Sequence, residues 1–354
     1  MTDIEQGFDC YFGTLDASDS LHNAHILDLD AAPTEEVRQL AVAFKGIRAE
    51  INGRFATNAV DIVAPTGEVR IHMDYIASSE VNAFAFTFEG WYFIGITEGM
   101  LALFAKSCSD LWRLNLLGEL LAVKLTNAKK DSIFQFLLLL ELQYISNHEL
   151  GHLFHGHCAD LSAGRYRAEF DARTLAEESI GLEAQAKELE ADGYAVNLLL
   201  KNLLQSPSGA FIHQRLGSPL PERETVLTLF VLSMAAVLYY LEPPAKFDPA
   251  KVKQARHSNG MARMNILLGE VLGWCTDNVN WPDAISLEHF QWIMSLITTA
   301  ASKPAQEAIW TEQGAYLQTE AGKAYLADIY KRRINLRKKM EPHCWRLKSE
   351  MSLS

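Results

Sequence analysis

Two histidines and one glutamate lie within five residues near the middle of the chain, in the stretch His148-Glu149-Leu150-Gly151-His152. On a helix, residues four positions apart lie on one face, so both imidazoles could hold the same metal ion. Glu149 lies about 100° around the helix from His148, where its carboxylate can reach a water on the metal without binding the metal. This H-E-x-x-H spacing predicts metal-assisted hydrolysis, with the histidines as zinc ligands and Glu149 as general base.

A long helix is expected to carry this stretch. The residues from Ile133 to Ile145 form an apolar run that is too long for a typical strand. Asp131-Ser132 precedes the run like a helix N-cap, so we expect one helix from there to about His157. Buried histidines and glutamates are costly without partners, and a metal ion would supply one. The alternative is a surface glutamate flanked by two solvated histidines.

The two histidines alone do not complete a catalytic zinc site, which needs a third protein ligand and an open position for water. A histidine at position 158 after a glycine at position 155 would provide one, but the chain has Cys158 and His155 there. His155 lies three residues after His152 and would point further along the helix. We therefore expect His155 and His157 at the surface, or behind the ligands, at the end of the helix.

A carboxylate from a following helix is the other option, and the segment Glu183–Ala195 offers several. Glu188 and Asp192 are four residues apart, and three alanines share their face, which would let this helix approach the active helix closely. We therefore predict Glu188 as the third ligand. Asp192 is expected to accept the outer N–H of a ligand histidine and fix its tautomer. Glu190 lies about 200° away from Glu188 and is assigned to solvent.

The order of these motifs resembles the gluzincin metallopeptidases, most closely the HtpX and CAAX-prenyl-protease type. The resemblance spans residues 80 to 265 in four ordered blocks: Asn82-Ala83-Phe84-Ala85 with Ile94 to Leu101, the H-E-x-x-H stretch, Glu188 with Asp192, and His257 with Arg263. It implies a zincin-like core and one Zn²⁺ ion held by His148, His152 and Glu188.

Peptidases of this kind usually place an edge strand beside the active helix, and a peptide substrate adds to it through backbone hydrogen bonds. The segment Asn82 to Ala85 is the expected substrate strand, although an ordinary core hairpin gives the same pattern. The resemblance also implies that His257 or Arg263 approaches the cleft, where it stabilises the oxyanion or holds the site together. For Arg263, a purely structural ion pair is an equal alternative.

The chain departs from that family in two ways. Ser258 follows His257 where the family has a proline, and no clear membrane span is visible. The most apolar remaining run, Val226 to Leu241, is shorter than the about 20 residues that a span normally needs, so we expect a buried core helix. A soluble arrangement resembles instead the phage-exclusion peptidases of the Lit type.

These motifs predict a zinc metallopeptidase, an endopeptidase whose substrate is a protein or peptide. One alternative is a regulatory or interaction protein in which the zinc site is structural or vestigial. Another is a membrane-associated protease anchored by the 226–241 run.

Composition limits the class of protein further. The 354 residues are 49% hydrophobic, enough for a substantial core in one large domain or two modest ones. The net charge of −12 argues against nucleic acid as a main partner. Five scattered cysteines and an N-terminus without a secretory pattern predict a cytoplasmic protein, and membrane association is not expected. The sequence leaves the oligomeric state open.

We expect a mainly helical α+β fold with a zincin-like core and a small, mostly antiparallel sheet beside the active helix. Residues 1–33 are expected to form an irregular acidic arm, since residues 1–37 carry nine acidic side chains and no lysine or arginine. The metallopeptidase domain is predicted over 34–265, with strands near 59–64, 69–73, 81–88 and 91–97. Residues 158–173 are expected to form a loop or insert, and 266–354 a helical region with a basic end.

Overall fold

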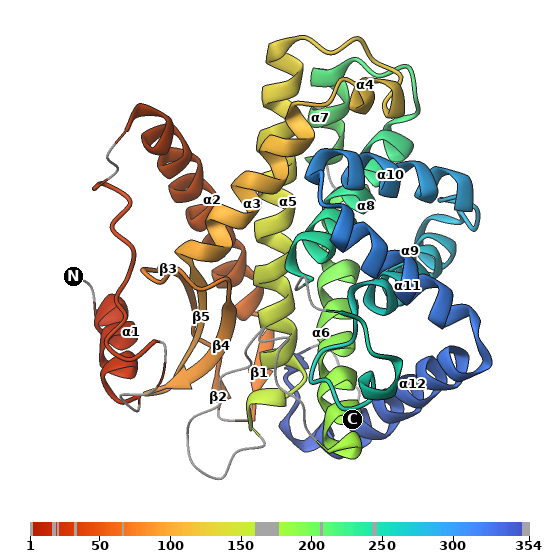
Figure 1. Cartoon of the computed structure of the whole chain (residues 1–354). Coiled ribbons are helices and arrows are strands. Elements are labelled where there is room, and N and C mark those ends of the chain that lie inside the picture. Colours follow the sequence, from red (N-terminus) through yellow and green to blue (C-terminus); the bar gives the residue numbers. More distant parts are fainter. Residues whose placement is uncertain are drawn as a thin grey trace. The chain divides into compact units, whose positions relative to one another are not determined.

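The computed structural model describes residues 3–15, 19, 21–31, 34–65, 67–159, 177–205, 208–242 and 246–348. These residues form a mainly helical α+β protein with two small three-stranded sheets, which confirms the predicted fold class. The chain divides into two compact units. Figure 1 shows the helices and strands, coloured from the N-terminus in red to the C-terminus in blue. The sheet unit comprises residues 1–102, 145–170 and 335–354, and the helical unit comprises residues 103–144 and 171–334.

The larger sheet of the sheet unit has the order β3-β5-β4, with bounds Ile71–Ile76, Trp91–Thr97 and Ala83–Phe88. β3 runs parallel to β5, and β4 runs antiparallel to it. Glu89 and Gly90 both have positive φ, 49° and 81°, as a tight type I′ hairpin requires. The smaller sheet, β2-β1-β6, is antiparallel and pairs Gly67–Glu68, Ile62–Ala64 and Arg346–Leu347. Among the described residues, antiparallel pairings therefore predominate, as expected.

The N-terminal segment is helical, which corrects the expectation of an irregular arm. Helix α1, Asp3–Gly13, is drawn in red in Figure 1. Its Phe8, Tyr11 and Phe12 are buried against the aromatic face of the sheet, which includes Phe84 and Phe86. The spacing of these three rings makes an apolar stripe on one helix face, and its burial outweighs the acidity of the segment. The three-part domain division itself stays a prediction.

The opposite face of β3 packs against helix α2, Glu35–Ala59. Thr34 is its N-cap and accepts a hydrogen bond from the backbone N–H of Val37 at 3.3 Å. The Asn52 side chain donates to the Met73 carbonyl and accepts from the Met73 N–H, both at 2.8 Å. These bonds fix the register of α2 on the sheet.

The two edges of the larger sheet differ. The outer edge of β3 pairs with the segment around Ile26, through Leu27 N–H to the Tyr75 carbonyl at 2.8 Å and Ala77 N–H to the His25 carbonyl at 2.9 Å. β4 pairs on its inner edge with β5 alone. Within the described ranges, β4 is therefore the edge strand to which no further strand is added.

The other helices follow in chain order, and α3, α5 and α12 run from one unit into the other. The described elements are α3 Glu98–Trp112, α4 Leu116–Leu120, α5 Asn127–Phe154, η1 His157–Ala159, α6 Glu178–Leu204, α7 Ser208–Leu216, α8 Glu222–Leu241, η2 Pro249–Lys251, α9 Gly260–Val279, α10 Leu287–Ala301, α11 Pro304–Gln318, α12 Glu320–Met340 and η3 Glu341–His343. The long helix that carries His148 and His152 is confirmed as α5, although it begins and ends a few residues earlier than expected. Most of the predicted 158–173 insert lies outside the described residues.

Helix α8 forms the centre of the helical unit. It is long and apolar enough to cross a membrane by length and composition, but 89% of its apolar window is buried inside the protein. Its residues from Thr225 to Tyr240 are buried on every side. This matches the expected core helix, because a membrane span would present an apolar surface to lipid.

Glu141 is a fully buried acid on α5 in the helical unit. One carboxyl oxygen, Oε1, accepts a hydrogen bond from the Ser107 hydroxyl at 3.1 Å, and Oε2 has no hydrogen-bond partner among the described residues. Burial raises the pKa of Glu141 well above its usual value. The folded protein therefore keeps this proton in a pH range where the unfolded chain releases it.

This difference in proton binding predicts a pH-dependent stability. Because the folded state binds more protons, the free energy of unfolding should fall as pH rises above the unfolded pKa of about 4.3. Glu141→Gln is neutral at every pH, so we expect it to match or exceed the wild type at pH 8 and to lose this pH dependence. Urea unfolding from pH 4 to pH 8 measures the effect, with the exposed Glu119→Gln as control. A variant less stable than the wild type at pH 8 would contradict the assignment.

Candidate metal centre

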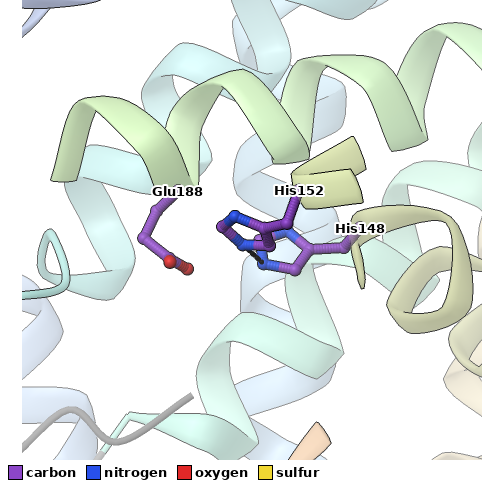
Figure 2. Close-up of side chains that lie close together, drawn as sticks. All are labelled: His148, His152 and Glu188. Atoms are coloured by element: carbon purple, nitrogen blue, oxygen red, sulfur yellow. Dashed lines mark hydrogen bonds between the residues drawn. The ribbon is translucent and has the colours of Figure 1, made fainter. Parts of the chain in front are cut away.

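Three buried side chains come together as a possible metal site. His148 and His152 on α5 and Glu188 on α6 each offer a ligand atom, and these atoms all lie within 4.8 Å of one another. Figure 2 shows the two imidazoles lying together, with the Glu188 carboxylate directed toward them. The Nε2 atoms of His148 and His152 are 3.2 Å apart. Two nitrogens and a carboxylate oxygen in this arrangement can hold a divalent metal ion.

Helix α5 explains why the two imidazoles converge. Its backbone stays helical from Asn127 through Phe154, so positions 148 and 152 lie one turn apart on the same face. Both rings are buried, as is Glu149 between them in sequence. Burial of three such side chains in one turn is costly unless a cation or hydrogen bonds compensate, and a bound metal ion would do so.

His157 contacts the predicted ligand His152 on the side of its ring that faces away from His148. Its side chain is fully buried, and its Nδ1 lies 3.0 Å from Nδ1 of His152, the ring nitrogen opposite the one that faces His148. A hydrogen bond at this position fixes the His152 tautomer and leaves Nε2 for the metal. Of the two positions expected for His157, the structure shows the one behind the ligands. The ring of His155 lies beside it and is only partly buried.

The chain returns His157 toward the helix by a sharp turn after α5. Gly156 has a φ of 72°, and a Cβ atom there would lie 2.7 Å from the backbone of His343. Both constraints require glycine. The Trp345 N–H then donates to the Phe154 carbonyl at 2.8 Å and satisfies a group at the helix end. Gly156 is visible in the sequence as a residue that permits such a turn. The backbone that it packs against, at His343, lies far along the chain and is not visible in the local sequence.

Glu188 has an imidazole neighbour in the helical unit. Nδ1 of His257 lies 3.2 Å from Oε2 of Glu188, and both side chains are nearly buried. His257 stands just before α9, whose N-cap Asn259 accepts a hydrogen bond from the Ala262 N–H at 2.8 Å. The predicted site residue His257 therefore contacts a predicted metal ligand. Its direct part in chemistry stays a prediction.

Asp192 is held by a buried hydrogen-bond cluster with Arg263 and Tyr144. Arg263 donates from Nε at 2.9 Å and from Nη2 at 2.6 Å to the two carboxylate oxygens, and the Tyr144 hydroxyl donates at 2.6 Å. Burial disfavours the guanidinium charge, but Asp192 more than offsets this and raises the pKa of Arg263. Burial and the Asp192 charge also raise the pKa of Tyr144, which keeps the phenol protonated. Asp192 as a partner of a ligand histidine stays a prediction.

Tyr144 is a residue that the sequence reasoning missed. It lies one turn before His148 on α5, and Asp192 lies one turn after Glu188 on α6. Their hydrogen bond therefore ties the two ligand-bearing helices together at one turn from the ligands. A tyrosine in an apolar run carries no distinguishing signal, because the partner carboxylate lies 48 residues away.

Tyr144→Phe should lower the free energy of unfolding by about 1.5–3 kcal/mol, since a buried hydrogen bond to a charged group is lost. Tyr239→Phe is the matched control. Tyr239 is equally buried, but its hydroxyl has no hydrogen-bond partner in the described part of the chain. That variant should be neutral or stabilising. Urea unfolding of both proteins checks the prediction, and equal effects would contradict the role given to the Tyr144 hydroxyl.

One sequence assignment on α6 is wrong. Glu190 was expected in solvent, but only 1% of it is exposed. The prediction assumed that α6 has one buried face. The helix is instead buried around most of its circumference near Glu188, so residues 188 to 193 are all buried. Angular position on the helix therefore does not distinguish a metal-ligand position from a solvent-exposed one on α6.

The expected substrate strand lies mainly in β4. Asn82 immediately precedes the strand, and its carbonyl accepts a hydrogen bond from the Thr97 N–H at 3.0 Å. Ala83, Phe84 and Ala85 are fully buried in β4, with their backbone as well as their side chains. Peptide binding at this strand stays a prediction.

Taken together, the described residues form a buried His-His-Glu group that can hold a metal ion, with a glutamate beside it on α5. Comparison with known proteins adds nothing to this: no protein-family model, curated protein or solved structure matches the chain. The function must therefore be argued from the chemistry of these residues.

Proposed function

We propose that this protein is a zinc-dependent endopeptidase of the gluzincin type, similar to the HtpX and CAAX-prenyl-protease group and to soluble phage-exclusion peptidases of the Lit type. The observation that carries the proposal is the buried ligand group of His148, His152 and Glu188 with Glu149 next to it. A carboxylate beside the ligands is not needed to hold a metal, but it is needed to move a proton.

In the proposed mechanism, His148, His152 and Glu188 hold the ion. Zinc bound there would lower the pKa of a water molecule and polarise the scissile carbonyl. Glu149 takes a proton from the attacking water and later delivers it to the leaving amine. His257 positions the Glu188 carboxylate, which it contacts at 3.2 Å. Arg263 holds Asp192 and, through it, the segment of α6 that follows Glu188.

A structural zinc site is the second candidate, because the burial of the three ligands also suits an ion that never meets a substrate. The two functions differ at Glu149. A structural site has no use for a general base, whereas a hydrolase depends on it. The choice between them is therefore a question of turnover rather than of metal binding.

We further propose that the protein acts in the cytoplasm on a protein or peptide substrate. The burial of α8 supports a soluble enzyme over a membrane-anchored one. The acidic composition makes nucleic acid an unsuitable partner. Fractionation without detergent tests this, and recovery of the native protein only in membranes would contradict it.

Cleavage of a peptide library derived from a proteome tests the proposed function. The zinc-loaded protein should produce new peptide termini, detected by mass spectrometry. Removal of the metal with a chelator should stop cleavage, and added Zn²⁺ should restore it. Cleavage that persists at full rate in the metal-free protein would overturn the proposal.

A further inference from the structure

Gln185 is a fully buried glutamine on α6, and its side-chain amide is hydrogen-bonded on both sides within the helical unit. Its Nε2 donates to the backbone carbonyls of Val252 at 2.7 Å and Ala255 at 2.6 Å. Its Oε1 accepts from the hydroxyls of Ser258 at 3.2 Å and Tyr325 at 2.7 Å. A glutamine amide has two N–H donors and two lone pairs on its oxygen, so these partners use its whole hydrogen-bonding capacity.

The partners also fix the orientation of this amide. Carbonyl oxygens can only accept, so the Nε2 side must face Val252 and Ala255. Burial raises the pKa of Tyr325, which keeps its hydroxyl protonated and able to donate to Oε1. In a buried position, any other orientation of the amide would leave polar groups without partners, which is costly. The network therefore holds the segment from Val252 to Ser258, which connects η2 to α9, in one position on α6.

The segment that Gln185 holds carries His257. Ala255 lies two residues before His257 and Ser258 directly follows it, so Gln185 is bonded to the chain on both sides of the imidazole. Nδ1 of His257 in turn lies 3.2 Å from Oε2 of Glu188. Gln185 and Glu188 are three residues apart on α6 and are therefore neighbours on its surface. The anchor of His257 and the carboxylate that it contacts thus lie within one turn of the same helix.

Close packing of α6 against the same segment supports this arrangement. Gly181 lies one turn before Gln185, and a Cβ atom there would lie 2.4 Å from the carbonyl oxygen of Lys253. Only glycine allows the backbone of the segment to approach the helix so closely. Gly181, Gln185 and Glu188 share one helix face, because they are spaced by four and then three residues. The segment therefore follows the face of α6 that carries the predicted ligand.

We propose that Gln185 is a positioning residue for the metal site: its amide holds His257 in contact with the Glu188 carboxylate and thereby keeps Glu188 in the orientation that binds zinc. The inference rests on the proposed function, since it takes Glu188 as a zinc ligand. Partners behind a metal ligand fix its orientation, and their loss typically lowers metal affinity by about 10–100-fold. Loss of the Gln185 amide should therefore weaken zinc binding, although Gln185 is not itself a ligand.

The zinc dissociation constant of the full-length protein tests the proposal, measured by competition with a chromophoric chelator. Gln185→Met has a side chain of similar length without the amide, so it should raise Kd by about 10-fold. Gln306→Met is the matched control. Gln306 is also a buried glutamine of the helical unit, and its Nε2 also donates to two backbone carbonyls, those of Tyr239 and Glu242. This control should be destabilised in urea to a similar extent but keep the wild-type Kd.

A double-variant cycle tests whether the effect passes through the imidazole. His257→Ala alone should also raise Kd by about 10-fold, because the contact with Glu188 is lost. Adding Gln185→Met to His257→Ala should then raise Kd little further, since the two residues act on the same carboxylate in series. Effects of the two changes that multiply in the double variant would overturn the proposal, as would wild-type zinc affinity in a folded Gln185→Met protein.

A milder pair of changes keeps the proposal testable if Gln185→Met does not fold. Ser258→Ala with Tyr325→Phe removes both bonds to Oε1 and leaves Gln185 in place, so it should raise Kd a few-fold. Ser233→Ala with Tyr239→Phe is its control. Both of these hydroxyls are buried in the helical unit and have no hydrogen-bond partner among the described residues. The control should keep the wild-type Kd, and equal values of Kd for the two double variants would overturn the proposal.

The failures of the two proposals can be distinguished, because zinc affinity is measured without a substrate. Unchanged affinity in the Gln185 variant would overturn the positioning role and leave the peptidase intact. The predicted series of affinities in a protein whose wild type cleaves no peptide of the library would support the positioning role and overturn the peptidase.

Discussion

Glu149→Gln is expected to lower kcat/KM for peptide hydrolysis by about 10²–10⁴-fold, the usual contribution of a general acid–base group, while leaving the bound metal in place. Glutamine has nearly the same shape but does not accept the proton of the attacking water. Because Glu149 lies outside the group of three predicted ligands, the ion should remain. Steady-state cleavage of a peptide identified from the library, combined with metal analysis of the same sample, measures both effects.

Glu141→Gln is the matched control for this loss. Glu141 is also a buried glutamate on α5, but its contact is Ser107 in the helical unit and not the metal group. It should retain wild-type kcat/KM. The general-base role would be refuted by a Glu149→Gln enzyme that cleaves as fast as the wild type while carrying the same amount of metal.

Arg263→Ala should cost about 3–5 kcal/mol of folding stability, because it leaves a carboxylate buried without its charge partner. Asp192 is fully buried and Arg263 is 3% exposed, so water does not replace the lost hydrogen bonds without local opening. Urea unfolding of the wild type and the variant at pH 8 measures the change.

Two further variants keep this prediction testable if Arg263→Ala does not fold. Arg263→Lys retains a positive charge but loses the two-point contact with Asp192, so it should be destabilised less than the alanine variant. The double variant Asp192→Ala with Arg263→Ala removes both charges and should be more stable than the sum of the single losses implies. Purely additive losses would contradict a direct partnership of the two side chains.

The sequence predicted those parts of the site that lie on one helix. His148, Glu149 and His152 lie within five residues at the end of a long apolar run, and helical geometry alone then determines which face they occupy. The hairpin was also predictable, since Glu89-Gly90 between alternating residues supplies the positive φ values of a tight turn. These features depend only on residues a few positions apart in the sequence, so the spacing of residue types is enough to predict them.

Features that depend on distant partners were not predictable in this way. The many acidic residues near the N-terminus led us to overlook the apolar stripe of Phe8, Tyr11 and Phe12. The burial of these rings depends on a sheet whose strands lie more than 60 residues further along the chain. Glu190 was misassigned because the number of elements around α6 is not visible in its own periodicity. The contact of His157 with His152 could not be predicted from spacing, because it depends on α5 ending at Phe154 and on Gly156 turning the chain back.

The amount of metal bound to the purified protein tests the central claim most directly. After zinc loading and dialysis, inductively coupled plasma mass spectrometry should find one zinc ion per wild-type chain and much less in Glu188→Ala, since two histidines alone bind weakly. Glu183→Ala, five residues earlier in the same helix, should keep its zinc. A wild-type protein that binds no zinc, or a Glu188→Ala protein that keeps a full equivalent, would contradict the metal site described above.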